Sequence, residues 1–207
     1  SLGIQVDPGD TEIERGTSLQ VMVRFEKKLP FEVTLHHQGG AAVSQQVSMS
    51  QSLDDPVFAS RLSNVQQDMV YHVSYPGWKS PSYRVRVFDY PALQQADAKL
   101  VFPGYTGLSE KQVTDVRRVT AVEGTQVTLA MYLNKPIHAG HLRDSENREI
   151  PLQPTAINPH MYTVEMPLMA SGRYRLHLVD DQERANKFPP EFVFRATPNQ
   201  TPKLTIK

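Results

Sequence analysis

Two stretches of the chain decide its fold: Ile13-Glu14-Arg15-Gly16-Thr17-Ser18-Leu19-Gln20-Val21-Met22-Val23 and Val122-Glu123-Gly124-Thr125-Gln126-Val127-Thr128-Leu129-Ala130-Met131. Each begins with an apolar residue followed by a glutamate, continues through a Gly-Thr turn, and then alternates strictly between apolar and polar residues. Alternation with period two places the apolar side chains on one face of a β-strand. The two stretches are separated by about the length of one β-sandwich domain. The sequence therefore predicts the same structural unit twice.

The rest of the chain continues this pattern, with turn residues at the spacing typical of all-β proteins. No convincing helix is found, although residues 109–116 could form one short helical turn. The segment Ala92–Asp97 is interpreted as a short linker. Because Pro91 and Pro103 restrict the backbone on either side of it, we expect a fairly fixed joint with Tyr105 close to it.

A local motif specifies the type of sandwich more closely. Gly172-Arg173-Tyr174-Arg175-Leu176 follows a turn, as the tyrosine corner of immunoglobulin-like domains does, and Tyr71 occupies the matching place in the first half. Trp78 lies in a Pro-Gly-Trp-Lys turn, so it is not the core tryptophan of an antibody domain. We expect an all-β protein of two tandem immunoglobulin-like β-sandwich domains, at residues 1–91 and 98–207, with residues 198–207 beginning a connection to a further unit.

The alternation also predicts the core residues of each unit. The expected core of the first unit contains Leu19, Val21, Val23, Tyr71, Val73 and Val85. That of the second contains Val127, Leu129, Met131, Tyr174, Leu176 and Leu178.

Composition argues against several classes of function. The 22 basic and 22 acidic residues balance, and the basic residues form no cluster longer than a pair, so no nucleic-acid partner is expected. No apolar run approaches the roughly 20 residues of a membrane helix, so this segment is not expected to insert directly into a membrane. The chain has no cysteine, which removes thiolate chemistry and disulfides.

One family shares several of these motifs. Leu100-Val101-Phe102-Pro103-Gly104-Tyr105-Thr106-Gly107-Leu108, then Ala121–Thr125, then Gly172–Asp180 resemble an immunoglobulin-like repeat of large membrane-anchored bacterial proteins, many of them from planctomycetes, whose function is uncharacterised. The resemblance covers residues 98–207 well and residues 1–97 only through the turn and the strand order. It implies the fold, an extracytoplasmic location and a membrane-anchored parent protein. It implies no catalytic residues.

Metal, cofactor and catalytic sites are not expected. His36 and His37 are adjacent on a strand and point to opposite faces, and the pair His138 and His141 lacks a third ligand. The carboxylates at Asp54-Asp55 and in Asp180-Asp181-Gln182-Glu183 lack the alternating spacing of a calcium loop, which favours hydrophilic turns. No catalytic motif is present, so the chain is interpreted as not an enzyme.

Exposed aromatic residues are the remaining candidates for a binding surface. Trp78, Tyr75 and Tyr105 all fall at strand ends or in loops, as does Tyr90. Trp78 could instead cover the end of the first core, and Tyr105 could instead pack between the two units, beside Pro103. The first hypothesis for function is a non-enzymatic structural or protein-interaction segment of a longer extracytoplasmic bacterial protein, with an unknown protein or cell-surface partner. The alternative is a carbohydrate-binding accessory module, and a hydrolase fragment is disfavoured by the missing motifs.

Overall fold

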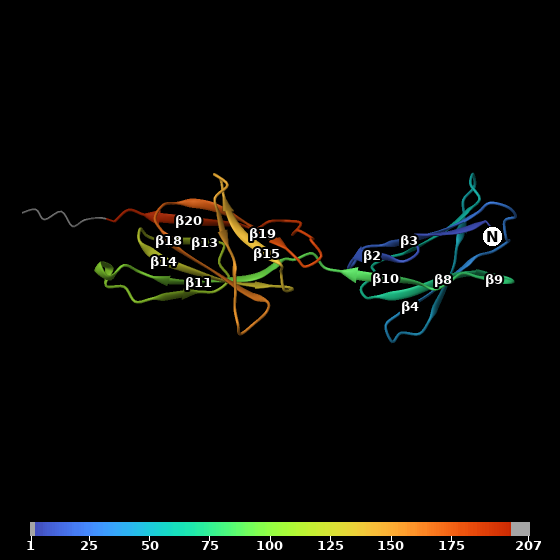
Figure 1. Ribbon diagram of the computed structural model, residues 1–207, viewed down its shortest axis with the longest axis horizontal. Coiled ribbons are helices and arrows are strands. Elements are labelled where there is room, and N and C mark those ends of the chain that lie inside the picture. Colours follow the sequence, from blue (N-terminus) through green and yellow to red (C-terminus); the bar gives the residue numbers. More distant parts are fainter. Residues whose placement is uncertain (1–2, 200–207) are drawn as a thin grey trace, which may run out of the picture. The chain divides into compact units, whose positions relative to one another are not determined.

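The computed structural model describes residues 3–199 and is built from β-strands (Figure 1). Contacts between residues divide the chain into two compact units, Ser1–Asp89 and Tyr90–Lys207. Each unit encloses its own apolar core between two sheets, so the two are described separately. The all-β class predicted from the alternation is confirmed.

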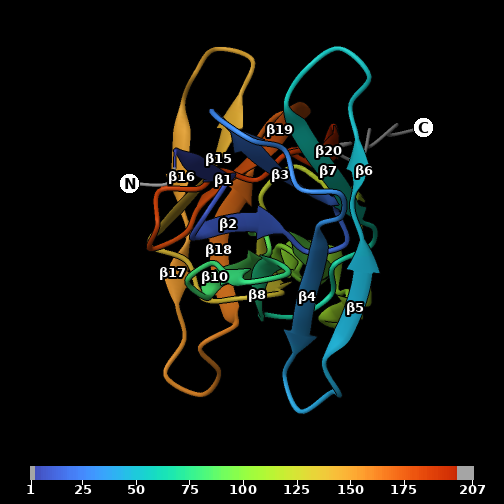
Figure 2. The same ribbon diagram turned by 90° about the vertical axis from the view of Figure 1, so that its right-hand side faces the viewer.

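Unit 1 has one sheet in the order β1-β3-β7-β6 and a second in the order β2-β10-β8-β4-β5, with β9 paired to β8 (Figure 2). The first sheet contains β1 (Ile4–Asp7), β3 (Leu19–Phe25), β7 (Val57–Leu62) and β6 (Ser50–Gln51). The second contains β2 (Thr11–Glu14), β10 (Tyr83–Phe88), β8 (Met69–Tyr75), β4 (Thr34–Gly39), β5 (Gln45–Ser48) and β9 (Trp78–Lys79). The strands pair antiparallel except β2 and β10, which are parallel.

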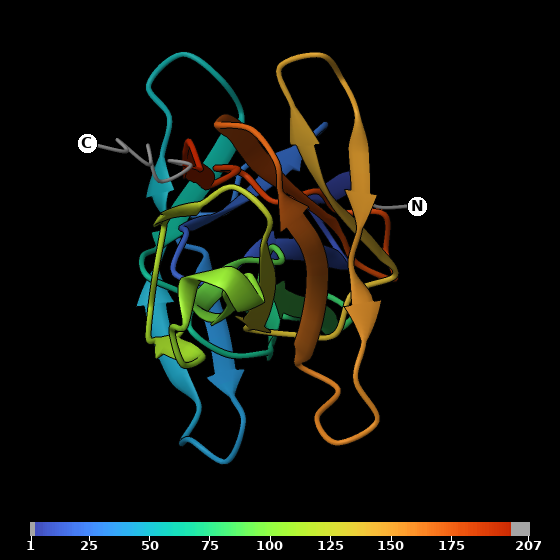
Figure 3. The ribbon, with the colours of Figure 1, turned by 90° about the vertical axis from the view of Figure 1, so that its left-hand side faces the viewer.

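Unit 2 repeats this arrangement, with sheets in the orders β12-β11-β14-β18-β17 and β13-β20-β19-β15-β16. The first sheet contains β12 (Lys111–Val113), β11 (Leu93–Val101), β14 (Thr125–Leu133), β18 (Met161–Leu168) and β17 (Gln153–Pro154). The second contains β13 (Arg118–Val122), β20 (Glu191–Thr197), β19 (Gly172–Val179), β15 (Ala139–Asp144) and β16 (Glu149–Pro151). Again one pair of strands, β13 and β20, is parallel. A short 3-10 turn at Gly104–Thr106 follows β11 (Figure 3).

The two Gly-Thr turns do the same work in both units, as their sequences predict. Gly16 and Gly124 have φ angles of 81° and 86°, a left-handed conformation that glycine adopts without strain. The Oγ1 atoms of Thr17 and Thr125 each donate a 2.7 Å hydrogen bond to the carbonyl oxygen three residues earlier. Both turns lead into the matching strands, β3 and β14, so the internal repeat of the sequence is a repeat of structure.

Each unit also has a segment that leaves one sheet and joins the other. β5 and β6 are separated only by Met49, and β16 and β17 only by Leu152. Both side chains are buried, and their N–H groups donate 2.9 Å hydrogen bonds to the carbonyl oxygens of Val33 and Gly140, respectively. In Figure 2, β5 and β6 follow one another along a single extended segment. The segment thus closes one side of the sandwich with one short piece in each sheet.

The predicted core is confirmed at all positions but one. Eleven of the twelve expected core side chains are at most 7% exposed, so the predicted register is right. Tyr174 is the exception: it is half-buried, and its ring meets the edge of Phe194 at 5.4 Å between centroids.

Tyr71 secures the crossing of the chain between the two sheets of unit 1. Its hydroxyl accepts a 2.9 Å hydrogen bond from the N–H of Gly9 and donates a 3.1 Å bond to the carbonyl oxygen of the same residue. Burial raises the pKa of Tyr71 to about 12, although the bond to Gly9 acts in the opposite direction. The predicted role of a tyrosine at the strand crossover is therefore filled by Tyr71.

Two expectations about the middle of the chain were wrong. The expected linker Ala92–Asp97 lies almost wholly in β11, because the strand begins at Leu93 and buries Ala96 and Ala98 against the core. These small side chains carry little apolar signal in the sequence. Residues 109–116 contain strand β12 and no helical turn. Of the connection expected over residues 198–207, all but the first two residues lie outside the described part of the chain.

Replacing Gly124 with alanine tests the turn. We expect unit 2 to lose about 1–2 kcal/mol, because alanine is strained at this φ angle and its Cβ would lie 3.3 Å from Cγ of Pro103. Gly104→Ala is the matched control, since Gly104 has no positive φ and its Cβ would meet nothing within 4 Å. Urea denaturation compares the two variants, and equal stability would show that the turn does not require glycine.

Candidate functional site

Tyr75 and Trp78, two of the predicted candidates, lie together at one end of unit 1. They are opposite each other on β8 and β9, and their rings stack at 5.3 Å between centroids with an angle of 20°. Tyr75 also meets the edge of Phe25, a core residue, at 5.8 Å. Both side chains are half-buried and pack against the core of unit 1, so they cover its end as well as bordering the surface.

A hollow of about 880 Å³ lies beside Tyr75 at this end of the unit. It is lined by Lys28, Leu29, Pro30, Phe31, Glu32, Gln51, Tyr75 and Pro76. The Phe31 side chain is fully exposed, so its ring has no packing role within the unit. We call this surface the apolar end of unit 1, defined by Leu29, Phe31, Tyr75 and Trp78.

Two connections of the sandwich and one strand build the apolar end. The loop between β3 and β4 supplies residues 28–32, the turn between β8 and β9 supplies Pro76, and β6 contributes Gln51. Leu29-Pro30 lies directly before Phe31, and proline restricts the loop that presents the ring. Lys28 and Glu32 place one charge of each sign on either side of this apolar centre. Chemically, the surface offers rings and aliphatic carbon with polar groups at its border.

Sequence reasoning missed Phe31. The candidates predicted from the sequence were aromatic residues in turns and at strand ends, whereas Phe31 lies in the loop directly before strand β4. Phe31, Val33 and Leu35 alternate with polar residues, so the pattern places Phe31 on the side of the buried Val33 and Leu35, and the sequence gives no signal that its ring is exposed.

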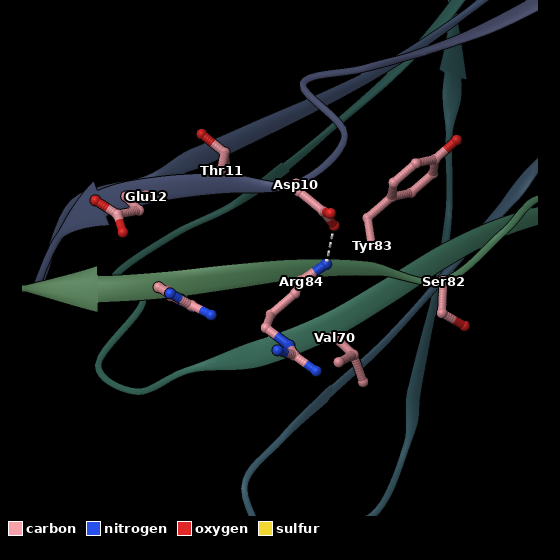
Figure 4. A pocket seen from close by; sticks show the side chains of 8 residues that line it. Asp10, Thr11, Glu12, Val70, Ser82, Tyr83 and Arg84 are labelled. Carbon is pink, nitrogen blue, oxygen red and sulfur yellow. Dashed lines mark hydrogen bonds between the residues drawn. The ribbon is translucent and has the colours of Figure 1, made fainter.

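A second hollow of about 570 Å³ lies along β2 and β10 of unit 1 (Figure 4). The main-chain N–H of Arg84 donates a 2.7 Å hydrogen bond to Oδ1 of Asp10 there, which joins β10 to the loop before β2. The Arg84 side chain lies beside Val70, which is 44% exposed. The hollow is open, and its lining includes the two arginines Arg84 and Arg86 and the two acidic residues Asp10 and Glu12.

Tyr105, the third predicted candidate, lies apart from the apolar end, in unit 2. It belongs to the 3-10 turn Gly104–Thr106, is 60% exposed, and its hydroxyl is 3.5 Å from the carbonyl oxygen of Glu123. The turn follows the last residue of β11, whereas the chain enters unit 2 at the first. The length of the strand, about 30 Å at 3.3 Å per residue, thus separates Tyr105 from the expected joint.

Asp180, of the second predicted carboxylate cluster, has structural partners. Oδ1 of Asp180 accepts hydrogen bonds from the N–H groups of Gln182 and Arg184, and Oδ2 lies 2.8 Å from Nζ of Lys135. Asp144 holds the turn to Arg148 in the same way. These aspartates close hairpins, and among residues 3–199 no group of three or more His, Asp or Glu side chains is arranged to hold a metal ion.

The histidines are placed by the strands as expected. His36 faces outward and stacks on His72 at 4.5 Å, whereas His37 lies opposite Tyr71 on the core side. Burial lowers the pKa of His37. His141 on β15 stacks on His177 of β19 at 5.2 Å, and His138 lies in the preceding loop.

The comparisons with protein-family models and with curated proteins identify no relative. Residues 3–199 contain no helix with the length and apolar character of a membrane-spanning segment. No protein-family model matches the sequence, and no curated protein matches it either.

Proposed function

We propose that both units are immunoglobulin-like domains and that the chain is a non-enzymatic interaction segment of a longer extracytoplasmic protein with a membrane anchor. The strand orders support the first part. Immunoglobulin-like domains place their strands A, B, E and D in one sheet and C, F and G in the other, with a C′ strand beside C in the larger forms. The orders β1-β3-β7-β6 and β10-β8-β4-β5 follow this scheme, and so do the matching strands of unit 2.

The observation that carries the interaction role is the apolar end of unit 1. Phe31 is fully exposed beside a hollow lined by Leu29, Tyr75 and Pro76. An exposed aromatic ring beside an apolar hollow with a charged border has the composition of a protein-binding surface, in which buried aromatic anchors supply most of the affinity. The surface is built from the loops at one end of the sandwich, where antibody domains also carry their binding loops.

The stacked pair favours a protein partner over a sugar. A carbohydrate-binding platform needs a free aromatic face, but Tyr75 and Trp78 cover one face of each other. Phe31 alone presents an uncovered ring at this end. A partner side chain can fill the hollow beside it, and the extracytoplasmic location, which rests on the family resemblance, makes this partner a protein of the cell envelope or cell surface.

Site-specific photo-crosslinking tests the proposal. A photoreactive phenylalanine at position 31 of the full-length protein in its native cells is expected to give a discrete adduct with one protein. The same residue at position 188 is the matched control, because Phe188 is 84% exposed and belongs to unit 2. The same adducts from both positions, or none from position 31, would contradict the proposal.

A glycan array distinguishes the alternative. The chain is expected to bind no neutral glycan above the level of a Phe31→Ser variant. Binding of a neutral glycan that Phe31→Ser and Trp78→Ala both abolish, in variants with unchanged thermal melting, would make the protein a carbohydrate-binding module instead.

A further inference from the structure

The outward face of the sheet β13-β20-β19-β15-β16 in unit 2 concentrates basic side chains. Alternation turns Leu142, Leu176 and Phe194 toward the core, so their neighbours along the strands point outward. The outward arginines are Arg118, Arg143, Arg173, Arg175 and Arg195, which we call the basic face. Only Glu149 and Glu191 oppose them among the outward residues of these strands, giving a formal charge of +3 in a chain whose net charge is zero.

At the centre of this face, basic residues lie directly opposite each other on the neighbouring strands β15 and β19. Arg143 lies directly opposite Arg175, and the next outward pair along the same strands is His141 opposite His177. Like charges directly opposite each other destabilise a sheet. Arg143 has a counter-ion in Glu149 at 2.7 Å, and Arg173 has one in Glu191 at 2.8 Å. Within residues 3–199, Arg118, Arg175 and Arg195 form no ion pair, so three guanidinium groups remain to meet an external anion.

The matching sheet of unit 1 also has a pair of basic residues at the position equivalent to Arg143 and Arg175. His36 lies opposite His72 on β4 and β8, one residue from the core pair of Leu35 and Val73. Arg143 and Arg175 stand in the same relation to the core pair of Leu142 and Leu176. Both units therefore place two basic side chains across the same two strands of the fold.

The opposite sheet of unit 2 has no such bias. Its central strands β11, β14 and β18 turn Asp97, Lys99 and Glu165 outward, which gives a formal charge of −1. The basic face also lacks an apolar centre, since Val193 and Val179 are its only large apolar outward side chains on β19 and β20 and both are half-buried. A protein interface has an apolar core that is depleted of charge. A flat array of guanidinium groups instead fits a ligand whose binding groups are anions in series.

We propose that the basic face of unit 2 binds an acidic polysaccharide, with the guanidinium groups of Arg118, Arg175 and Arg195 contacting its carboxylate or sulfate groups. Guanidinium groups form paired hydrogen bonds with such planar or tetrahedral oxyanions. This ligand and this surface are separate from the protein partner proposed for unit 1.

Affinity measurements on the whole chain test this proposal. Heparin supplies sulfate groups, polygalacturonate supplies carboxylates, and dextran is the neutral control. We expect the chain to bind at least one acidic polymer at about 50 mM salt, weakening steeply as salt is raised, and not to bind dextran. The double variant Arg118→Gln and Arg175→Gln is expected to bind about tenfold more weakly.

A control variant that loses the same number of positive charges elsewhere shows whether binding depends on the basic face or only on the net charge of the chain. Arg24→Gln with Lys111→Gln removes two exposed cations from other sheets and is expected to bind like the wild type. Circular dichroism confirms the fold of both variants. Equal loss in the two variants, no binding of either acidic polymer, or binding of duplex DNA more tightly than both polymers would overturn the proposal.

The paired histidines add a pH dependence. The pKa of His177 is lowered by burial, and then by Arg143, His141 and Arg175, against an opposing effect of Glu149. Glu191, opposite Arg175, is the remaining charged group that faces this strand from β20. An anionic ligand favours the protonated ring, so affinity is expected to rise several-fold as the pH falls below about 6.5. His177→Gln is expected to flatten this rise while retaining binding at neutral pH. An unchanged rise would mean that His177 does not take part.

Discussion

Replacing Asp180 with alanine is expected to lower the free energy of unfolding of unit 2 by about 3–5 kcal/mol, because it removes a buried carboxylate that pairs with two largely covered cations. The Asp180 side chain is fully buried. Its Oδ2 lies 2.8 Å from Nζ of Lys135 and 3.6 Å from Nη1 of Arg184, and both cations are largely covered. The variant also loses the acceptor for two main-chain N–H groups, which opens the hairpin that follows β19.

The same carboxylate gives a stability that depends on pH. Burial by itself would raise the pKa of Asp180, but the bonds from Lys135, Arg184 and Gln182 together lower it below the ordinary value of 3.8. A carboxyl with a lowered pKa in the folded state stabilises the protein above its unfolded pKa and loses this contribution as the pH falls through the folded pKa. Unit 2 is therefore expected to lose this stabilisation below about pH 4, and Asp180→Asn is expected to show a smaller loss over the same range.

Two spectroscopic signals make the measurement specific to unit 2. Trp78 is the only tryptophan and belongs to unit 1, so its emission follows that unit, whereas circular dichroism follows both. Asp180→Ala is expected to shift the dichroism transition in urea and leave the tryptophan transition in place. Asp181→Ala, an exposed neighbour, is the control and is expected to change stability by less than about 0.5 kcal/mol. Similar shifts for both variants would show that Asp180 is not a structural charge.

Leu129→Ala is the second large effect, with an expected loss of about 2–5 kcal/mol in unit 2. Leu129 is fully buried on the central strand β14, which pairs with both β11 and β18, so the surrounding strands cannot collapse easily into the space. Gln126→Ala on the same strand points outward and is expected to be nearly neutral. If Gln126→Ala destabilised the unit as much as Leu129→Ala, the burial pattern of this strand would be contradicted.

Alternation of large apolar residues made most of the fold predictable. Leu19, Val21 and Val23 alternate with polar residues, so the period alone fixed the face of β3 that meets the core. The same reasoning failed at Ala96 and Ala98, since alanine differs too little from a linker residue to mark a strand. The strand position of Tyr174 predicts a core residue, but Tyr174 lies opposite Asp144, the last residue of β15, near the end of the sheet, and stays half-buried.

The candidate surfaces were less predictable for a different reason. A binding surface joins residues from several loops, and a sequence shows only the members of one loop at a time. Tyr75 and Trp78 could be paired because two residues separate them, whereas Phe31 joins them only through the packing of β4 against β8. The arginines of the basic face come from four strands, and their common direction requires the sheet order as well as the alternation.

The segments that change sheets at Met49 and Leu152 have a consequence for folding in tandem. Neighbouring copies of one domain in a chain are prone to join exposed sheet edges and misassemble. Here β6 and β17 present only two residues each, and Pro151 and Pro154 remove two N–H donors from the margin of unit 2. A short edge strand offers few backbone groups to which a strand of another copy could pair, and proline removes N–H donors from the edge of unit 2. These two margins therefore offer little for edge-to-edge pairing between neighbouring copies of such a unit.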